Sequence, residues 1–96
     1  MIRHVVLMKL TDPADAPEAK ARLEALQGQI PALLSLEVGL DVLRTEASYD
    51  LCLITTHDSA QALDDYQLHP VHQEFRAWVG PRLAGRAVVD SESPPA

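Results

Sequence analysis

Apolar and polar residues alternate along several stretches of the chain, and this alternation indicates β-strands. Residues 2–10 (IRHVVLMKL) are rich in aliphatic and β-branched residues. Residues 33–42 (LLSLEVGLDV) place an apolar residue at every second position. Residues 49–56 (YDLCLITT) and 85–92 (GRAVVDSE) have a similar composition. Because side chains on a strand point alternately to its two faces, the pattern predicts four strands.

Helical spacing separates these stretches. Residues 18–30 carry Leu23, Leu26 and Ile30 at spacings of three and four among good helix formers, which predicts an amphipathic helix that ends at Pro31.

A second helix is predicted over residues 59–69, with Asp58 as its N-cap and Gln61 as the capping-box partner. Pro70 has no backbone N–H, so it should end or kink this helix at His69 and start another helical piece over residues 70–80.

The resulting order is βαββαβ. It predicts an α+β, ferredoxin-like fold in which helices cover one face of a four-stranded antiparallel sheet. Two of the strands have apolar residues on both faces: Val5 and Leu7 oppose Ile2, Val6, Met8 and Leu10, and Cys52 and Ile54 oppose Leu51 and Leu53. A single copy would expose an apolar sheet face, which usually marks an interface. We therefore expect a homodimer whose two sheets face each other.

The length of 96 residues predicts one domain, over residues 1–90, followed by a disordered tail at residues 91–96 (SESPPA). The net charge of −6 and the pI of about 5.0 argue against nucleic-acid and anionic-membrane partners. No apolar run approaches the ~20 residues of a membrane span. The N-terminal residues lack the pattern of a signal peptide, and the single Cys52 suits a reducing compartment. A cytoplasmic protein is expected.

The segment YQLHPVHQEF carries the candidate chemistry. Tyr66 and His69 are three residues apart and share a helix face, and His72 continues that face beyond Pro70. A neutral imidazole can accept a proton near pH 7, and a phenol can donate a hydrogen bond to a developing oxyanion. These residues indicate a general base, His72, with Tyr66 as its partner.

Structural roles are the alternative for each of these residues. His69 can cap the end of its helix, and Tyr66 can be a core aromatic residue. Phe75 and Trp78 fit either the core or a cavity wall. His4, which alternates in phase with Ile2 and Val6, can be a satisfied buried residue, and His57 is expected to be exposed.

Metal ligation by His69 and His72 lacks a second ligand pair, and Cys52 is expected to be a buried, inert thiol. We expect neither a metal ion nor a cofactor.

The stretches IRHVVLMKL, IPALLSLEVGLDV, YDLCLITT and ALDDYQLHPVHQEF together resemble the stress-responsive A/B barrel domain (Dabb) family over nearly the whole chain. The resemblance implies a ferredoxin-like subunit that dimerises into an α+β barrel. In plant polyketide cyclase members of the family, the residue matching His72 acts as base and the residue matching Tyr66 binds the substrate carbonyl. The residue matching His69 belongs to the same motif, and the one matching His4 lies near the cavity.

Two positions depart from the family pattern. His57 stands where the family usually has phenylalanine, and the last strand lacks the common aromatic residue.

Two functions remain open from the sequence. The first is a cofactor-independent enzyme, a cyclase, isomerase or lyase, that binds a small hydrophobic carbonyl compound. In it His72 and Tyr66 are catalytic, and His4, His69, Phe75 and Trp78 contact the ligand. The second is a non-catalytic, stress-responsive homodimer with a ligand-binding cavity.

Overall fold

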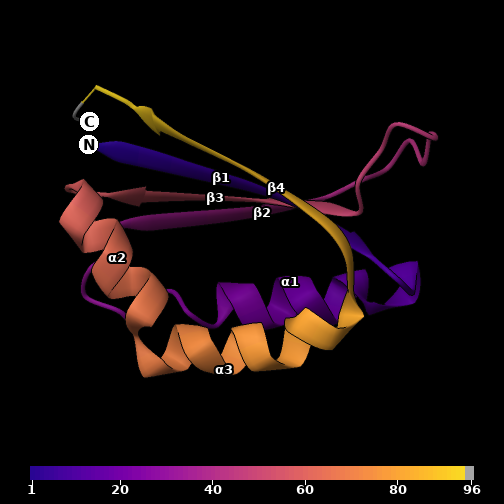
Figure 1. Ribbon diagram of the computed structural model, residues 1–96, viewed down its shortest axis with the longest axis horizontal. Coiled ribbons are helices and arrows are strands. Elements are labelled where there is room, and N and C mark those ends of the chain that lie inside the picture. The colour runs from indigo at the N-terminus through magenta and orange to yellow at the C-terminus, as the bar shows by residue number, and fades with distance from the viewer. Residues whose placement is uncertain (95–96) are drawn as a thin grey trace.

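The computed structural model describes residues 1–94 and confirms the predicted βαββαβ order. Its elements are β1 (Ile2–Leu10), η1 (Pro13–Asp15), α1 (Ala16–Glu24), β2 (Ser35–Leu40), β3 (Leu51–His57), α2 (Ala60–Leu68), α3 (Pro70–Val79), η2 (Gly80–Arg82) and β4 (Leu83–Glu92). The strands form one antiparallel sheet in the order β2-β3-β1-β4. All the helices lie on the same side of this sheet (Figure 1).

Several boundaries differ from those predicted. Helix α1 ends at Glu24, and the chain turns over residues 25–29, where Gly28 adopts a φ of 84°. Left-handed backbone of this kind favours glycine and interrupts a helix. Leu26 and Ile30 are nevertheless buried, so the apolar spacing identified core residues beyond the end of the helix.

Two further expectations from the sequence are wrong. The N-cap of α2 is Ser59, whose hydroxyl accepts from the backbone N–H of Ala62; Asp58 precedes the cap, and Gln61 binds Asp65 instead. Strand β4 includes Ser91 and Glu92, which agrees with the strand predicted over residues 85–92 and contradicts a disordered tail that begins at residue 91. The last two residues of that tail, 95 and 96, lie outside the described residues.

The core fills the space between the sheet and the helices. Strands β1 and β3 contribute Val6, Met8, Leu51 and Leu53, and the helices contribute Leu23, Leu63, Tyr66, Phe75 and Val79. All these side chains are buried. Burial of this apolar surface is the main force that holds helices to the sheet.

The opposite sheet face is also apolar, as the sequence predicted. In the strand register, Val5 of β1 pairs with Ile54 on one side and Val89 on the other, and Leu7 pairs with Cys52 and Ala87. Directly paired residues point to the same face. The result is two apolar rows across three strands, which we call the open face.

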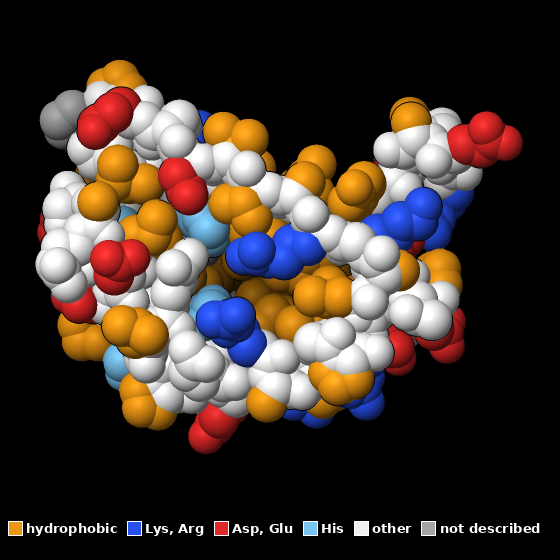
Figure 2. All heavy atoms as spheres, in the orientation of Figure 1, with side chains coloured by type: hydrophobic (Ala, Val, Ile, Leu, Met, Phe, Trp, Pro, Cys, Tyr) orange, Lys and Arg blue, Asp and Glu red, His pale blue; other side chains and the backbone are white. Residues whose placement is uncertain are grey.

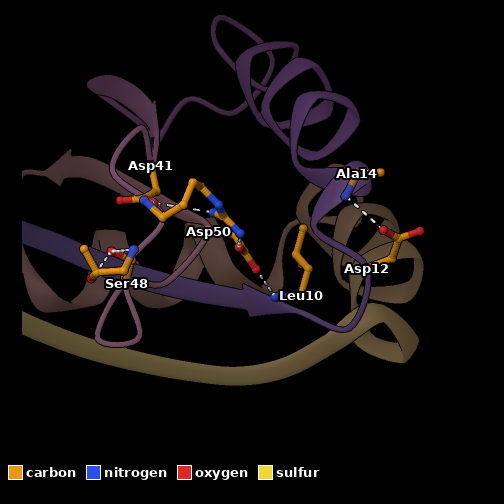
Figure 3. Close-up of polar contacts among 8 residues, drawn as sticks. Leu10, Asp12, Ala14, Asp41, Ser48 and Asp50 are labelled. Carbon is orange, nitrogen blue, oxygen red and sulfur yellow. Dashed lines mark hydrogen bonds and ion pairs between the residues drawn. The ribbon is translucent and has the colours of Figure 1, made fainter.

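The loop between β2 and β3 rises beside the open face, away from the helices (Figure 1). Asp50 anchors it: its buried carboxylate accepts from the backbone N–H of Leu10 at 2.6 Å and pairs with the guanidinium of Arg44 at 2.7 Å (Figure 3). Burial by itself would raise the pKa of Asp50, but the hydrogen bonds and charges of these partners outweigh it and lower the pKa. Val42 and Leu43 stand exposed on the same loop.

Candidate functional site

The proline kink between α2 and α3 sets up the site. His69 has an extended backbone, with φ −62° and ψ 137°, and its Nδ1 accepts from the N–H of Val71 at 3.1 Å. His69 therefore caps the start of α3, with Pro70 at the first helical position, where its missing N–H costs nothing. The predicted break at His69 is confirmed.

Because of this cap, the carbonyl of Gln67 is free to accept a hydrogen bond from His72. In a continuous helix the N–H of Val71 would bind the carbonyl of Gln67, four residues earlier. Here that carbonyl instead accepts from Nδ1 of His72 at 3.1 Å and from the side-chain amide of Gln73 at 2.7 Å. A carbonyl can only accept, so Nδ1 of His72 carries the hydrogen and Nε2 keeps its lone pair.

Burial is the main cause that lowers the pKa of His72 to about 4, and the nearby charges of Arg76, His4 and Arg86 act in the same direction. The hydrogen bond to the carbonyl of Gln67 acts in the opposite direction. His72 is therefore neutral near pH 7, with Nε2 able to accept a proton.

Four aromatic side chains pack together next to the kink between α2 and α3. The ring centroid of Tyr66 lies 4.5 Å from that of His72, 4.8 Å from that of His57 and 6.5 Å from that of His4. We call these four residues the ring cluster. It joins α2 and α3 to the ends of β1 and β3.

His57 is buried, so the expectation that it is exposed is wrong. Its Nδ1 donates to the carbonyl of Ala32 at 2.8 Å, and its Nε2 accepts from the hydroxyl of Thr55 at 2.8 Å. Burial lowers its pKa. Both ring nitrogens are occupied by the protein, which is the arrangement of a structural histidine.

The hydroxyl of Tyr66 is buried and has no hydrogen-bond partner within residues 1–94. Burial raises the pKa of Tyr66 to about 12, so the hydroxyl stays protonated and can donate. An unpaired buried donor usually costs stability and calls for an explanation.

His4 pairs with Asp90 across the β1–β4 ladder, where the two residues are direct partners. Its Nδ1 donates to a carboxylate oxygen of Asp90, and its Nε2 makes no hydrogen bond within residues 1–94. A carboxylate in this position fixes the orientation of an imidazole.

A cavity of about 330 Å³ lies between the sheet and α3. Figure 2 shows it as a hollow with an apolar interior, a histidine in its wall and basic side chains on its rim. Its lining residues are His4, Val6, Met8, Leu53, Gln67, His72, Phe75, Arg76, Val79, Gly80, Leu83 and Arg86.

Three of the predicted site residues meet at this cavity: His4, His72 and Phe75. Tyr66 is fully buried behind His72 and is not among the lining residues.

His69 and Trp78 do not line the cavity either, so this geometry gives them no contact with a ligand there. His69 serves as the helix cap. Two guanidinium groups stack on the ring of Trp78, with the central carbon of Arg22 at 4.4 Å and that of Arg82 at 4.5 Å from its centroid. These stacked cations help to join α1 to the end of α3.

Sequence reasoning missed Arg76, Arg86 and Asp90. Arg76 could have been found, because it follows His72 by four residues and so shares its helix face. Arg86 and Asp90 reach the site only through the pairing of β4 with β1, which carries no local signal.

Within residues 1–94 no group of three or more His, Cys, Asp or Glu side chains is gathered as metal ligands. The same residues contain no helix long and apolar enough to cross a membrane. Cys52 is half-buried on the open face, not fully buried as expected.

A protein-family model and a related bacterial protein each match most of this chain. The model of the Stress Responsive A/B Barrel Domain (Dabb) matches residues 2–93. An uncharacterised protein of Streptomyces coelicolor is 38% identical, in a match that covers 82% of this chain and 94% of that protein.

Solved structures share the fold. A dimeric ferredoxin-like protein of unknown function from Thermobifida fusca has a TM-score of 0.82 at 29% identity, over 94% of this chain and 88% of that one. A dimeric protein of unknown function from Bacteroides fragilis has a TM-score of 0.85 at 27% identity, over 96% and 95%. A hydroxynitrile lyase from Passiflora edulis, at 18% identity and a TM-score of 0.78 over 98% and 96%, shows a likeness of fold alone.

Proposed function

The chain belongs to the Stress Responsive A/B Barrel Domain family, and on that premise we propose that it is a small cofactor-independent enzyme. It holds a hydrophobic carbonyl compound in the cavity between the sheet and α3 and removes a proton from the carbon next to the carbonyl. The observation that carries the proposal is His72: it lines the cavity, it is neutral near pH 7, and its Nδ1 is fixed by the carbonyl of Gln67.

In the proposed step, Nε2 of His72 takes the proton, and the electron pair of the broken C–H bond moves into the carbonyl to give an enolate. In an aldol-type ring closure, the enolate carbon then attacks a second carbonyl of the same molecule, and the alkoxide that forms takes the proton back from Nε2 of His72. In an isomerisation of an unsaturated ketone, the extended enolate instead takes that proton back at a different carbon. The hydroxyl of Tyr66 is proposed as the donor to the charged oxygen, because it is unpaired within residues 1–94 and stays protonated. To receive this bond, the substrate oxygen must reach past the ring of His72.

His4 is the competing base for the same step. It also lines the cavity with a free Nε2, and it has the carboxylate of Asp90 behind it, whereas His72 has only a backbone carbonyl. A carboxylate partner stabilises the imidazolium that forms when the base takes a proton. The two candidates therefore differ in the group that holds Nδ1, a backbone carbonyl for His72 and a carboxylate for His4.

Deuterium exchange tests the proposal. The α-protons of 4-phenylbutan-2-one are followed by proton NMR in D₂O at pH 7, with and without protein. The wild type should accelerate their exchange over buffer, and His72→Gln should remove about 10²-fold or more of that acceleration, the usual contribution of a general base.

His69→Asn is the matched control, because asparagine preserves the helix cap and removes an imidazole that does not line the cavity. It should keep the wild-type rate. Loss of exchange in His4→Gln but not in His72→Gln would mean that His4, and not His72, is the base. Absence of exchange with the wild type would argue against proton abstraction from ketones.

A non-catalytic ligand-binding protein is the second candidate, and one observation favours it. The pKa of His72 is about 4, so its imidazole has a low proton affinity. General-base catalysis is most efficient when the pKa of the base lies near the working pH. On this proposal the probe would shift NMR resonances of the lining residues while its protons exchange no faster than in buffer.

We also propose that two copies of the chain pair through the open face. The two apolar rows through Val5 and Leu7 support this arrangement, because solvent-exposed apolar surface of this kind usually marks an interface. The related structures from Thermobifida fusca and Bacteroides fragilis are described as dimeric.

A further inference from the structure

The rim of the cavity carries two arginines that make no ion pair with an acidic side chain of the described residues. Arg76 and Arg86 line the cavity, and neither makes an ion pair with a carboxylate within residues 1–94. Three other arginines, at positions 22, 44 and 82, do pair with Asp or Glu. No Asp or Glu is among the lining residues, although the chain has 14 acidic residues against eight Lys and Arg.

The two arginines come from opposite walls. Arg76 lies on α3, four residues after His72 and therefore on the same helix face. Arg86 lies on β4 directly opposite the buried Met8 of β1, so it points to the side of the sheet that the helices cover. Figure 2 shows basic side chains on either side of the hollow.

The positive charges of Arg76 and Arg86 both act on His72. Arg76 and Arg86 are each close enough to lower the pKa of this histidine. An anion bound between them would offset that effect and make His72 a stronger base once the ligand is in place. The two guanidinium groups therefore act on the place where the proposed chemistry occurs.

Inside the rim, the lining combines the polar side chains of His4, Gln67 and His72 with a larger set of apolar ones. The apolar part of the wall is formed by Val6, Met8, Leu53, Phe75, Val79 and Leu83. The volume of about 330 Å³ is at the small end of the range for small-molecule sites. A ligand that complements such a site has one anionic group and a compact apolar body.

We propose that the ligand is a small carboxylic acid with an aromatic or aliphatic body, whose carboxylate binds between Arg76 and Arg86. The planar guanidinium group matches a carboxylate through two parallel hydrogen bonds. The proposal rests on the proposed function only for the site's location: combined with it, the substrate class becomes a hydrophobic keto acid, whose carboxylate orients the acidic C–H bond toward His72.

An equilibrium binding experiment tests the inference. Wild-type protein labelled with ¹⁵N is titrated at low ionic strength with 3-phenylpropanoate and, separately, with its neutral isostere 3-phenylpropanamide. The acid should shift resonances of the lining residues and bind at least about tenfold more tightly than the amide, because hydrogen bonds to charged groups are stronger than neutral ones.

Arg76→Gln and Arg86→Gln should each weaken binding of the acid by about tenfold and leave binding of the amide unchanged. Lys20→Gln is the charge-matched control, since it removes one positive charge from α1 outside the cavity lining, and it should bind both probes like the wild type. Equal affinity for acid and amide, or an equal loss in Lys20→Gln, would overturn the inference. Tighter binding of phenyl phosphate than of 3-phenylpropanoate would also overturn the inference, because the site would then recognise a phosphate group and not a carboxylate.

This test is independent of catalysis. His72→Gln should still prefer the acid, because the arginines remain. Preference for the acid without deuterium exchange of the ketone would preserve the inference and contradict the proposed enzyme. Deuterium exchange of the neutral ketone without preference for the acid would support the proposed enzyme and contradict the inference of an anion site.

Discussion

The ring centroids of Tyr66 and His72 lie 4.5 Å apart at an interplanar angle of 57°. The two side chains differ in how their polar atoms are satisfied. Nδ1 of His72 is bound to the carbonyl of Gln67, whereas the hydroxyl of Tyr66 has no partner within residues 1–94. A buried donor without a partner is unusual in a folded protein, and this hydroxyl is the one that the proposed function assigns to the substrate oxygen.

Tyr66→Phe should therefore leave the free energy of unfolding unchanged or raise it by about 1 kcal/mol, because the variant removes a buried hydroxyl that makes no hydrogen bond. Urea denaturation measures the difference.

Thr55→Val provides the contrast within the same cluster. It removes a buried hydroxyl that is bonded to Nε2 of His57 and leaves that nitrogen without a partner. The expected cost is about 1–3 kcal/mol. Equal costs in Tyr66→Phe and Thr55→Val would mean that the tyrosine hydroxyl is bonded in solution and has a structural role.

Stability should fall as the pH falls from about 6.5 toward 4. Burial holds the pKa of His72 at about 4 in the folded protein, against an ordinary value of 6.5, and also lowers the pKa of His57. In that window the unfolded chain binds protons that the folded chain does not, so protonation favours unfolding. The contribution is fully present above pH 6.5 and is lost as the pH drops through the folded value.

Urea denaturation between pH 7.5 and 4.5 measures this slope, and His72→Gln should make it shallower. In parallel, the Cε1–H resonance of His72, assigned by its absence from His72→Gln, should not shift between pH 8 and about 5. A midpoint near pH 6.5 would contradict the buried environment described for this ring.

Asp50→Asn should cost about 1.5–3 kcal/mol of unfolding free energy, the range for hydrogen bonds to charged groups. Asparagine can still accept from Leu10, but it loses the ion pair with Arg44 (Figure 3). Arg44→Gln should cost less, at most about 1 kcal/mol, because the arginine side chain is half exposed. The larger effect of Asp50 would establish the carboxylate as the anchor of the β2–β3 loop; equal effects would make the ion pair itself the anchor.

Leu7→Lys should convert the proposed dimer into a monomer. The substitution places a charge in the middle of the apolar rows of the open face, where a facing sheet would have to desolvate it. Analytical ultracentrifugation measures the mass.

Leu68→Lys is the control, because Leu68 is an exposed leucine of α2, on the helix side of the sheet. It should leave the mass unchanged. A wild type that sediments as a monomer, or a Leu7→Lys variant that stays dimeric, would exclude the open face as the contact.

Local chemistry was enough to determine much of this fold. Alternation along residues 2–10 and 33–42, helical spacing around Leu23, and the missing N–H of Pro70 predicted the order of elements and the kink at His69. The apolar residues on both faces of β1 and β3 were also visible. Each of these signals depends only on neighbours within a few residues, which is why the sequence alone could carry them.

Only the tertiary structure decided what each side chain meets. His57 is buried, and its Nδ1 donates to the carbonyl of Ala32, 25 residues earlier in the chain. His4 finds Asp90, 86 residues away, through the β1–β4 ladder. Arg86 joins Arg76 at the cavity because β4 pairs with β1 and α3 packs beneath them. Strand order and register create these contacts, and neither is encoded in the periodicity of a single strand or helix.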